Sequence, residues 1–364
     1  WNLQNDPNRI SRSQLNFSRL DCNASGMDDL PLPKSPHSWD NFLSRHLGDW
    51  TGRAIAIDAN TGRLLHSVSY QLTTDSLTTS ATNPASALLT ASVTPDSQPD
   101  NAKPITIRYD ARSLHVFPDG SYSADSPILD FAPLLPTLPA APTFAIEHTL
   151  PISATERIRA FLVYAPQGDL PGTLRCVLLL EETRDGMFES RPPLSLTALL
   201  GQWGGAAETW RHNGTVMPRN DNVPAELRHK SGSAGGLMKT KTRVTVGWDP
   251  ASATVRRVTT LTEAGEKGNE IGSSSLYGKV WMPEGGLFDG VKFGDNSILL
   301  CLSSGCCLQG PERAPGIKEP VTSELVCLVT PGYRRRLMRV YDGVGQVASE
   351  TLAAESLLDN QTDK

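Results

Sequence analysis

A five-residue pattern, Gly-x-Trp-x-Gly, occurs twice in the chain, as GDWTG at residues 48–52 and as GQWGG at residues 201–205. Each copy follows a short segment whose apolar residues have helical spacing, and each precedes a segment of strand-like residues. A chain that repeats its opening in this way is organised in two similar halves. Its 364 residues are also enough for two domains of ordinary size.

The segment before each copy predicts a short helix. SWDNFLSRHLG begins with Ser38 as a candidate N-cap, has apolar residues at helical spacing and ends at Gly48. SRPPLSLTALLGQW, at residues 190–203, restarts the same scheme. We therefore expect a short helix at the start of each half.

The remainder of each half consists of many short strands joined by Gly, Pro, Asp and Asn turns. GRAIAID, PTFAIEHTL and RIRAFLVYAP are examples from the first half, and TKTRVTVGWD, ATVRRVTTLTE and GYRRRLMRVYD from the second. Such a pattern predicts an antiparallel all-β sandwich or barrel.

A second matched landmark lies near the end of each half. RIRAFLVYAPQG at 157–168 aligns without gaps with RRRLMRVYDGVG at 334–345. The alignment pairs Arg157 with Arg334, Arg159 with Arg336 and Tyr164 with Tyr341. Two landmarks in the same order indicate tandem duplication of one β-domain. We expect an extended N-terminal arm over 1–36, a first barrel over 37–190, a second barrel over 191–355 and a C-terminal tail over 356–364.

The tryptophan of each pattern is expected to fill one end of a barrel, where aliphatic side chains are too small. The first glycine permits the turn from helix to strand, and the second lets the strand bend tightly. An arginine from a late strand can then lie across the indole. The candidates are Arg159 for Trp50 and Arg336 for Trp203.

This constellation resembles the lipocalin, or calycin, signature. More closely, the chain resembles an uncharacterised lipocalin-like family of cyanobacteria and plastid-bearing algae and plants. The residues that carry the resemblance are WDNFLSRHLGDWTGRAIAIDANTGRLL, LHVFPDGSYSADSPIL, ESRPPLSLTALLGQWGGAAETW and RRRLMRVYD, within a span from Ser38 to about Ala354. The resemblance implies an all-β fold of two tandem antiparallel lipocalin-like β-barrels, each opened by a short helix and a Gly-x-Trp motif.

Composition and motifs argue against several functions. The balance of 34 basic and 39 acidic side chains gives a net charge of −5, which provides no basic footprint for nucleic acid. No apolar run approaches the length of a transmembrane helix, so we expect a peripheral membrane association at most. The cysteines form no C-x-x-C pair and the histidines no metal-binding spacing, so no metal site is predicted. No catalytic motif is present, and we assign no catalytic residue.

The candidate ligand-binding residues are Tyr164, Tyr341, Arg159 and Arg336. If the two tyrosines point into the barrels, their hydroxyls can bond a carbonyl-bearing ligand. The alternative is that the tyrosines are satisfied core residues, and that the arginines have a structural role with Trp50 and Trp203.

Three functions follow from the resemblance and the motifs. The first is a non-catalytic accessory or assembly subunit of photosynthetic pigment–protein complexes, such as a photosystem or light-harvesting complex. It would lie in the chloroplast, soluble or peripheral to the thylakoid. The second is a carrier or chaperone of a tetrapyrrole such as chlorophyll or a bilin, or of a carotenoid or lipid. The third is a bilin lyase-like enzyme, by analogy with the single-barrel chromophore lyases of phycobiliproteins. This chain differs from those lyases in its two expected barrels and has no matching bilin-handling motif.

Overall fold

The computed structural model describes residues 38–75, 86–91, 105–110, 114–126, 144–167, 170–187, 191, 194–212, 237–264, 270–281, 289–302, 304–315 and 320–358. Every element below belongs to the compact unit Ser35–Lys364. The expected arm over 1–36 lies outside the described residues.

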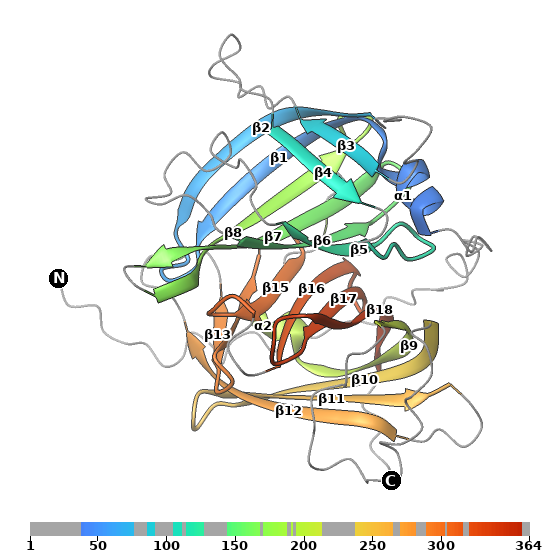
Figure 1. The fold of residues 1–364 in the computed structure, drawn as a ribbon. Coiled ribbons are helices and arrows are strands. Elements are labelled where there is room, and N and C mark those ends of the chain that lie inside the picture. Colours follow the sequence, from blue (N-terminus) through green and yellow to red (C-terminus); the bar gives the residue numbers. More distant parts are fainter. Residues whose placement is uncertain are drawn as a thin grey trace, which may run out of the picture. The chain divides into compact units, whose positions relative to one another are not determined.

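The first half forms one helix and an eight-stranded antiparallel sheet (Figure 1). The strand order is β4-β3-β2-β1-β8-β7-β6-β5. The elements are α1 (Ser38–His46), β1 (Gly48–Asp58), β2 (Leu64–Asp75), β3 (Ser86–Ala91), β4 (Ile105–Asp110), β5 (Tyr122–Ser126), β6 (Phe144–Pro151), β7 (Glu156–Gln167) and β8 (Leu170–Thr183).

The second half forms a short helix and a closed antiparallel barrel with the order β10-β11-β12-β13-β14-β15-β16-β17-β18-β9. The elements are α2 (Leu196–Leu199), β9 (Gly201–Arg211), β10 (Leu237–Asp249), β11 (Thr254–Glu263), β12 (Glu270–Trp281), β13 (Gly290–Phe293), β14 (Ser297–Cys301), β15 (Cys306–Pro311), β16 (Val321–Thr330), β17 (Tyr333–Tyr341) and β18 (Val347–Leu358). The expected all-β class is confirmed, and a closed barrel is confirmed for the second half. Residues 356–358 of the expected tail belong to β18.

The two Gly-x-Trp motifs make the same local structure. Gly48 and Gly201 open β1 and β9 with φ values of 106° and 111°, in a region that side chains disfavour. The indole Nε1 of Trp50 donates to the carbonyl of His46 at 3.2 Å, and that of Trp203 donates to the carbonyl of Leu199 at 3.0 Å. Each tryptophan is thus tied to the helical turn that precedes its strand.

The second glycine of each motif is required by close packing. A Cβ at Gly52 would overlap the ring of Tyr70, and a Cβ at Gly205 would overlap the carbonyl oxygen of Ala354. We expected these two glycines to let the strand bend. The structure gives another reason for glycine at both positions, which is that no side chain has space there.

The arginine on each indole is not the expected one. The guanidinium carbon of Arg157 lies 3.8 Å from the ring centroid of Trp50, and that of Arg334 lies 4.3 Å from that of Trp203. The expectation for Arg159 and Arg336 was wrong because residues two apart on a strand share a face. The two arginines of each half face the same interior, but only Arg157 in the first half and Arg334 in the second lie over the indole.

The described hydrophobic core has three clusters. One lies with Trp50 inside the first sheet, and one lies with Trp203 inside the second barrel. The third combines residues of both halves, including Leu162 of β7 and Leu337 of β17. Gly310 of β15 packs so tightly on Leu162 that a Cβ there would overlap it. Strand β7 is therefore buried on both faces.

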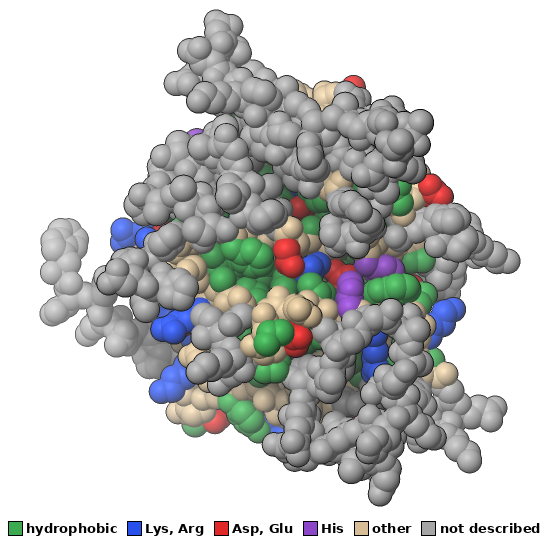
Figure 2. Space-filling view, in the orientation of Figure 1, with side chains coloured by type: hydrophobic (Ala, Val, Ile, Leu, Met, Phe, Trp, Pro, Cys, Tyr) green, Lys and Arg blue, Asp and Glu red, His purple; other side chains and the backbone are tan. Residues whose placement is uncertain are grey.

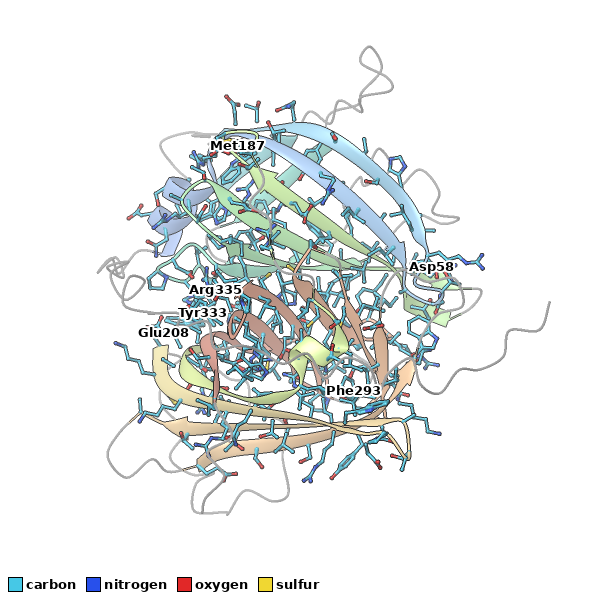
Figure 3. All side chains as sticks on the ribbon, turned by 180° about the vertical axis from the view of Figure 1, so that it is seen from behind. Asp58, Met187, Glu208, Phe293, Tyr333 and Arg335 are labelled. Atoms are coloured by element: carbon cyan, nitrogen blue, oxygen red, sulfur yellow. The ribbon has the colours of Figure 1, made fainter. Side chains whose placement is uncertain are left out.

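Polar contacts accompany this shared cluster. Arg335 donates to the carboxylate of Asp119 (Figure 3 shows Arg335 on β17). His148 Nδ1 lies 2.7 Å from Ser123 Oγ, and its Nε2 lies 3.0 Å from Ser323 Oγ. Burial, followed by the nearby positive charge of Arg339, lowers the pKa of His148 to about 3. The imidazole is therefore neutral at physiological pH.

The surface shows no single basic patch on the face seen in Figure 2, where the Lys and Arg side chains that are drawn lie scattered. Of the helices in the described residues, none has the length and apolar character needed to cross a bilayer.

Candidate functional site

A buried network of two arginines and two glutamates lies on the face of the first sheet that carries Trp50, which we call the first interior. Arg159 donates from Nε to Glu147 at 2.9 Å and from Nη1 to Glu182 at 3.2 Å. Arg157 forms a further ion pair with Glu182. All four residues are at least 98% buried. Positive and negative charges balance in this interior.

Three tyrosines complete the same network. Tyr70 donates its hydroxyl to Glu182 at 2.6 Å, while Tyr109 and Tyr122 donate to Glu147 at 2.7 and 2.8 Å. Burial and the adjacent carboxylates raise the pKa of each of these hydroxyls, so all three stay protonated. Their rings occupy the space that a ligand would need.

His46 of α1 closes the end of this interior. Its Nδ1 lies 2.9 Å from Arg157 Nη1 and its Nε2 lies 2.7 Å from the carbonyl oxygen of Gly120. Since an arginine only donates, Nδ1 accepts and Nε2–H donates. Burial and the charge of Arg157 lower the pKa of His46, which keeps it neutral. We interpret the first interior as a filled, structural one.

The second barrel repeats the arginines and glutamates. In the strand register, Arg157 stands opposite Glu182 and Arg334 opposite Glu355. Arg336 donates to Glu355 at 2.8 Å and to Glu324 at 3.2 Å, as Arg159 does to Glu182 and Glu147 in the first half.

A third arginine, Arg257 of β11, joins the second network. It donates to Glu324 at 2.7 Å and to the side-chain oxygen of Gln309 at 2.6 Å. Burial opposes ionisation of Glu324, but Arg257 and Arg336 overcome it and lower the pKa of this carboxyl to about 2. Among the described residues, the second interior thus holds three arginines against two ionised glutamates.

Polar side chains of the first interior are replaced by smaller or apolar ones in the second. The replacements are Leu199 for His46, Thr242 for Tyr70 and Cys307 for Tyr122. Three observations establish these correspondences. The backbone carbonyls of His46 and Leu199 each accept from the indole of the tryptophan of their half. Tyr70 pairs with Gly52 in the strand register, and Thr242 pairs with Gly205. Tyr122 pairs with Thr149 and Cys307 pairs with Val326. Thr149 and Val326 each lie eight residues before the arginine that covers the indole of their half.

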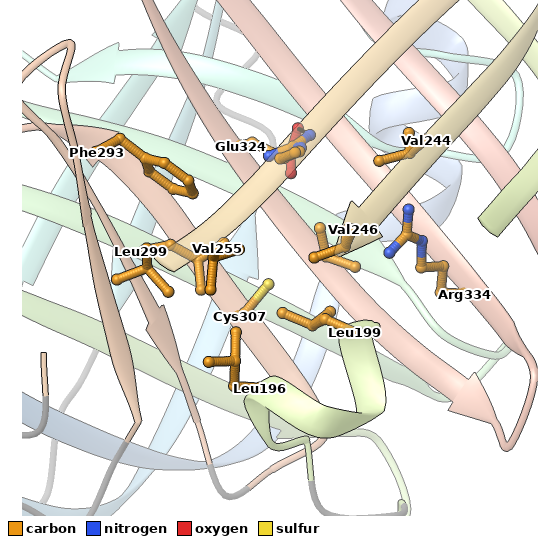
Figure 4. Close-up of a pocket in the computed structure, with 13 residues that line it drawn as sticks. Leu196, Leu199, Val244, Val246, Val255, Phe293, Leu299, Cys307, Glu324 and Arg334 are labelled. Atoms are coloured by element: carbon orange, nitrogen blue, oxygen red, sulfur yellow. Dashed lines mark hydrogen bonds and ion pairs between the residues drawn. The ribbon is translucent and has the colours of Figure 1, made fainter. Parts of the chain in front are cut away.

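Two of these replacements, Leu199 and Cys307, line a cavity in the second barrel (Figure 4). Leu196 and Leu199 of α2 line it at one end, and Cys307 is drawn beside them. Most of the lining is apolar; the lining residues are Leu196, Leu199, Val244, Val246, Val255, Arg257, Val291, Phe293, Leu299, Cys307, Glu324, Val326 and Arg334. The cavity has room for about one water molecule.

Arg334 is the polar group of this cavity with spare hydrogen-bond donors. Its Nε donates to Glu355 at 2.7 Å, and its guanidinium lies over Trp203. Among the described residues, no group accepts a hydrogen bond from its two terminal nitrogens. Burial lowers the pKa of Arg334 below its ordinary value, a sign that the surroundings compensate its charge incompletely.

The predicted tyrosines lie elsewhere. Tyr164 and Tyr341 belong to the hydrophobic cluster shared by both halves, not to either interior. The hydroxyl of Tyr164 donates to the carbonyl of Pro311 at 3.0 Å, and that of Tyr341 donates to Asp125 at 2.5 Å. The inward orientation was therefore wrong, and the alternative of core tyrosines with satisfied hydroxyls fits this geometry.

The predicted arginines do lie in the interiors, where glutamates hold them. A ligand-binding role for Arg159 and Arg336 stays a prediction. Sequence reasoning missed Arg257 and the site role of Arg334. Arg334 could have been found from its place in the aligned landmark, but no sequence signal distinguishes Arg257.

The described cysteines are five buried free thiols, with Sγ of Cys306 2.9 Å from Sγ of Cys327. Burial raises the pKa of Cys307, so the thiol in the cavity is protonated. Within the part of the chain that the structure describes, no group of three or more His, Cys, Asp and Glu residues could hold a metal ion.

No protein-family model and no curated protein matches the chain. Among solved structures, a protein of unknown function from the DUF3598 family of Nostoc punctiforme is similar with a TM-score of 0.60 and 21% identity, over 88% of this chain and 99% of that chain. The chain shares that protein's fold. Weaker similarities are to the S-type phycobiliprotein lyase CPES from Guillardia theta (TM-score 0.31, 10% identity, 46% of this chain and 92% of that one) and to Rv2717c from M. tuberculosis (TM-score 0.28, 10% identity, 45% and 94%). These two carry no argument about this chain.

Proposed function

We propose that the chain is a lipocalin-like binding protein whose second barrel holds one small, largely apolar ligand. The observation that carries the proposal is the cavity lined by Leu199 and Cys307, which stand where the first half has His46 and Tyr122. In the first half the corresponding side chains belong to the buried network of arginines, glutamates and tyrosines, so we place the ligand in the second half. Small pockets lined by apolar side chains with a few polar groups are typical of such sites.

We also propose that the halves are tandem domains of common origin, over 37–190 and 191–355. The equivalent bonds of Trp50 and Trp203, the arginine over each indole and the matching registers of Arg157 and Arg334 support this. The first half would then be a lipocalin-like barrel as well.

The role as a plastid accessory or assembly subunit of photosynthetic pigment–protein complexes stays a proposal, supported by the sequence resemblance. It is tested by fractionating native thylakoids and following the chain by immunoblot. Co-migration with a large pigment-bearing complex is expected. A chain that always runs alone contradicts this role.

The size of the cavity decides between ligand classes. Because the cavity holds about one water molecule, any organic ligand requires the lining side chains to move, and a tetrapyrrole or a carotenoid requires much more movement than a ligand of a few carbons. The geometry therefore favours a small ligand over a pigment. A bilin lyase-like enzyme is kept as the alternative, tested by incubating the chain with bilin and an apo-phycobiliprotein.

The binding proposal is tested by calorimetric titration of the full chain with 1-butanol and with butyrate, and by absorption spectra with chlorophyll and biliverdin. Val246→Phe fills the cavity, and Val344→Phe makes the same change at a residue that is 72% exposed. We expect one small molecule to bind per chain, with loss of binding in Val246→Phe only. Binding by none of the probes, or binding that survives the filling variant, would refute the proposal.

A further inference from the structure

We infer that the second barrel selects a short-chain organic carboxylate, whose carboxylate group binds to the two terminal nitrogens of Arg334. This inference rests on the proposed binding function and names its ligand class.

The first argument is charge. Arg257, Arg334 and Arg336 are at most 8% exposed, and the carboxylates bonded to them are those of Glu324 and Glu355. The first interior holds two arginines and two glutamates. A buried charge without a counterion is costly, and the described side chains of the second interior are one negative charge short. A monoanion in the cavity would restore the balance.

Neighbouring acidic groups do not supply that charge. The carboxylate of Asp289 accepts from the backbone N–H of Leu196, at 3.2 Å, and does not line the cavity. The thiol of Cys307 does line it but is protonated, because burial and the charge of Glu324 raise its pKa.

The second argument is the geometry of Arg334. Its Nε is fixed by Glu355 and its plane is supported by Trp203, so the guanidinium is held before a ligand arrives. The two terminal nitrogens carry the spare donors. A planar guanidinium edge matches the two oxygens of a carboxylate, which makes this pairing stronger and more selective than one with a neutral group.

The first half provides an internal comparison. Arg157 has the same place on its indole, but His46 accepts from its Nη1 at 2.9 Å. The residue in the place of His46 is Leu199, which has no acceptor in its side chain and lines the cavity instead. His46 thus supplies an acceptor for Nη1 of Arg157, whose Nη2 is buried without a hydrogen-bond partner in the described part of the chain, and Leu199 supplies no such acceptor for Arg334. A ligand oxygen can take the place of the His46 nitrogen in the second half.

The third argument is the apolar lining. Away from Arg257, Glu324 and Arg334, the lining side chains are aliphatic or aromatic apart from the Cys307 thiol. They suit a short alkyl chain. Because the cavity has room for about one water molecule, even a carboxylate of a few carbons requires the lining side chains to move, and a long-chain fatty acid requires far more movement.

The test compares butyrate with butyramide and 1-butanol by calorimetric titration of the full chain in low-chloride buffer. Variants are Arg334→Met, Leu199→His, which restores the acceptor of the first half, and Arg256→Met as a control on the exposed side of β11. We expect butyrate to bind at least about tenfold more tightly than the neutral molecules, and Leu199→His to weaken butyrate by at least about tenfold. Arg256→Met should bind like the parent chain.

Circular dichroism establishes that each variant is folded, and Leu199→His carries the test if Arg334→Met does not fold. Butyramide or butanol binding as tightly as butyrate, with no effect of Leu199→His, would overturn the carboxylate inference and leave the binding function standing. Binding of none of the three would overturn both.

Discussion

The unequal charge of the two interiors predicts unequal costs for removing an arginine. Arg159→Met leaves Glu147 and Glu182 with Arg157 as the remaining cation, and it also removes the bond from Arg159 Nη2 to Tyr109, 3.0 Å long. Breaking a buried ion pair by removing one partner costs about 3–5 kcal/mol, because the other charge is left uncompensated.

Arg257→Met removes a positive charge from the second interior, where the described arginines outnumber the glutamates by one. In this variant Glu324 still forms its ion pair with Arg336, 3.2 Å long. The variant also loses the hydrogen bond from Arg257 to Gln309, which is a neutral acceptor. A neutral hydrogen bond contributes about 1 kcal/mol. We therefore expect a loss of about 1–2 kcal/mol for Arg257→Met, clearly below that for Arg159→Met.

The assay is urea unfolding of both variants and the parent chain, followed by far-ultraviolet circular dichroism and by tryptophan fluorescence. Arg53→Met is the control, because the Arg53 side chain is 52% exposed and its pair with Glu181 should contribute at most about 1 kcal/mol. Equal losses for Arg257→Met and Arg159→Met would refute the charge argument.

Further expectations concern packing and pH. Gly205→Ala should destabilise the chain by several kcal/mol, on the order of an overpacked core, because its Cβ would overlap the backbone oxygen of Ala354. Gly247→Ala, which has open space around the added Cβ, should leave the melting temperature within a few degrees of the parent value; equal effects would refute this reading. His148 has a pKa near 3 against an ordinary 6.5, so its share of the stability is complete above pH 6.5 and is lost as the pH falls toward 3. At pH 5 the loss is about 2 kcal/mol. It is measurable as a pH slope in urea unfolding, which His148→Asn should make shallower; part of the slope remains, because burial also lowers the pKa of His46. A slope that His148→Asn leaves unchanged would contradict this expectation.

The sequence predicted the all-β class and the helical turn before each motif because those depend on local patterns. It did not predict which arginine covers the indole. Arg157 and Arg159 have the same orientation on β7, and alternation cannot rank two residues on one face.

The orientation of Tyr164 was missed for a different reason. Alternation of apolar and polar residues identifies the interior face when the other face meets water. Strand β7 is buried on both faces, since Leu162 and Tyr164 pack in the cluster shared with the second half. A strand of this kind has no polar face, so its pattern does not show which side is the inside of the sheet.

The cavity could not be predicted from one half alone. It depends on Leu199 and Cys307 standing where the first half has His46 and Tyr122, and those correspondences come from the bonds of the two tryptophans and from strand register. The spare donors of Arg334 could not be predicted either, because they depend on which acceptors lie near its terminal nitrogens in the folded chain.

The most direct test of the central claim is a crystal structure of the full chain grown with saturating butyrate. The account predicts carboxylate density within hydrogen-bond distance of the terminal nitrogens of Arg334, with the alkyl chain between Val246 and Val255 and no ligand in the first interior. Butyrate bound only outside the second barrel, or a cavity holding only water, would contradict it.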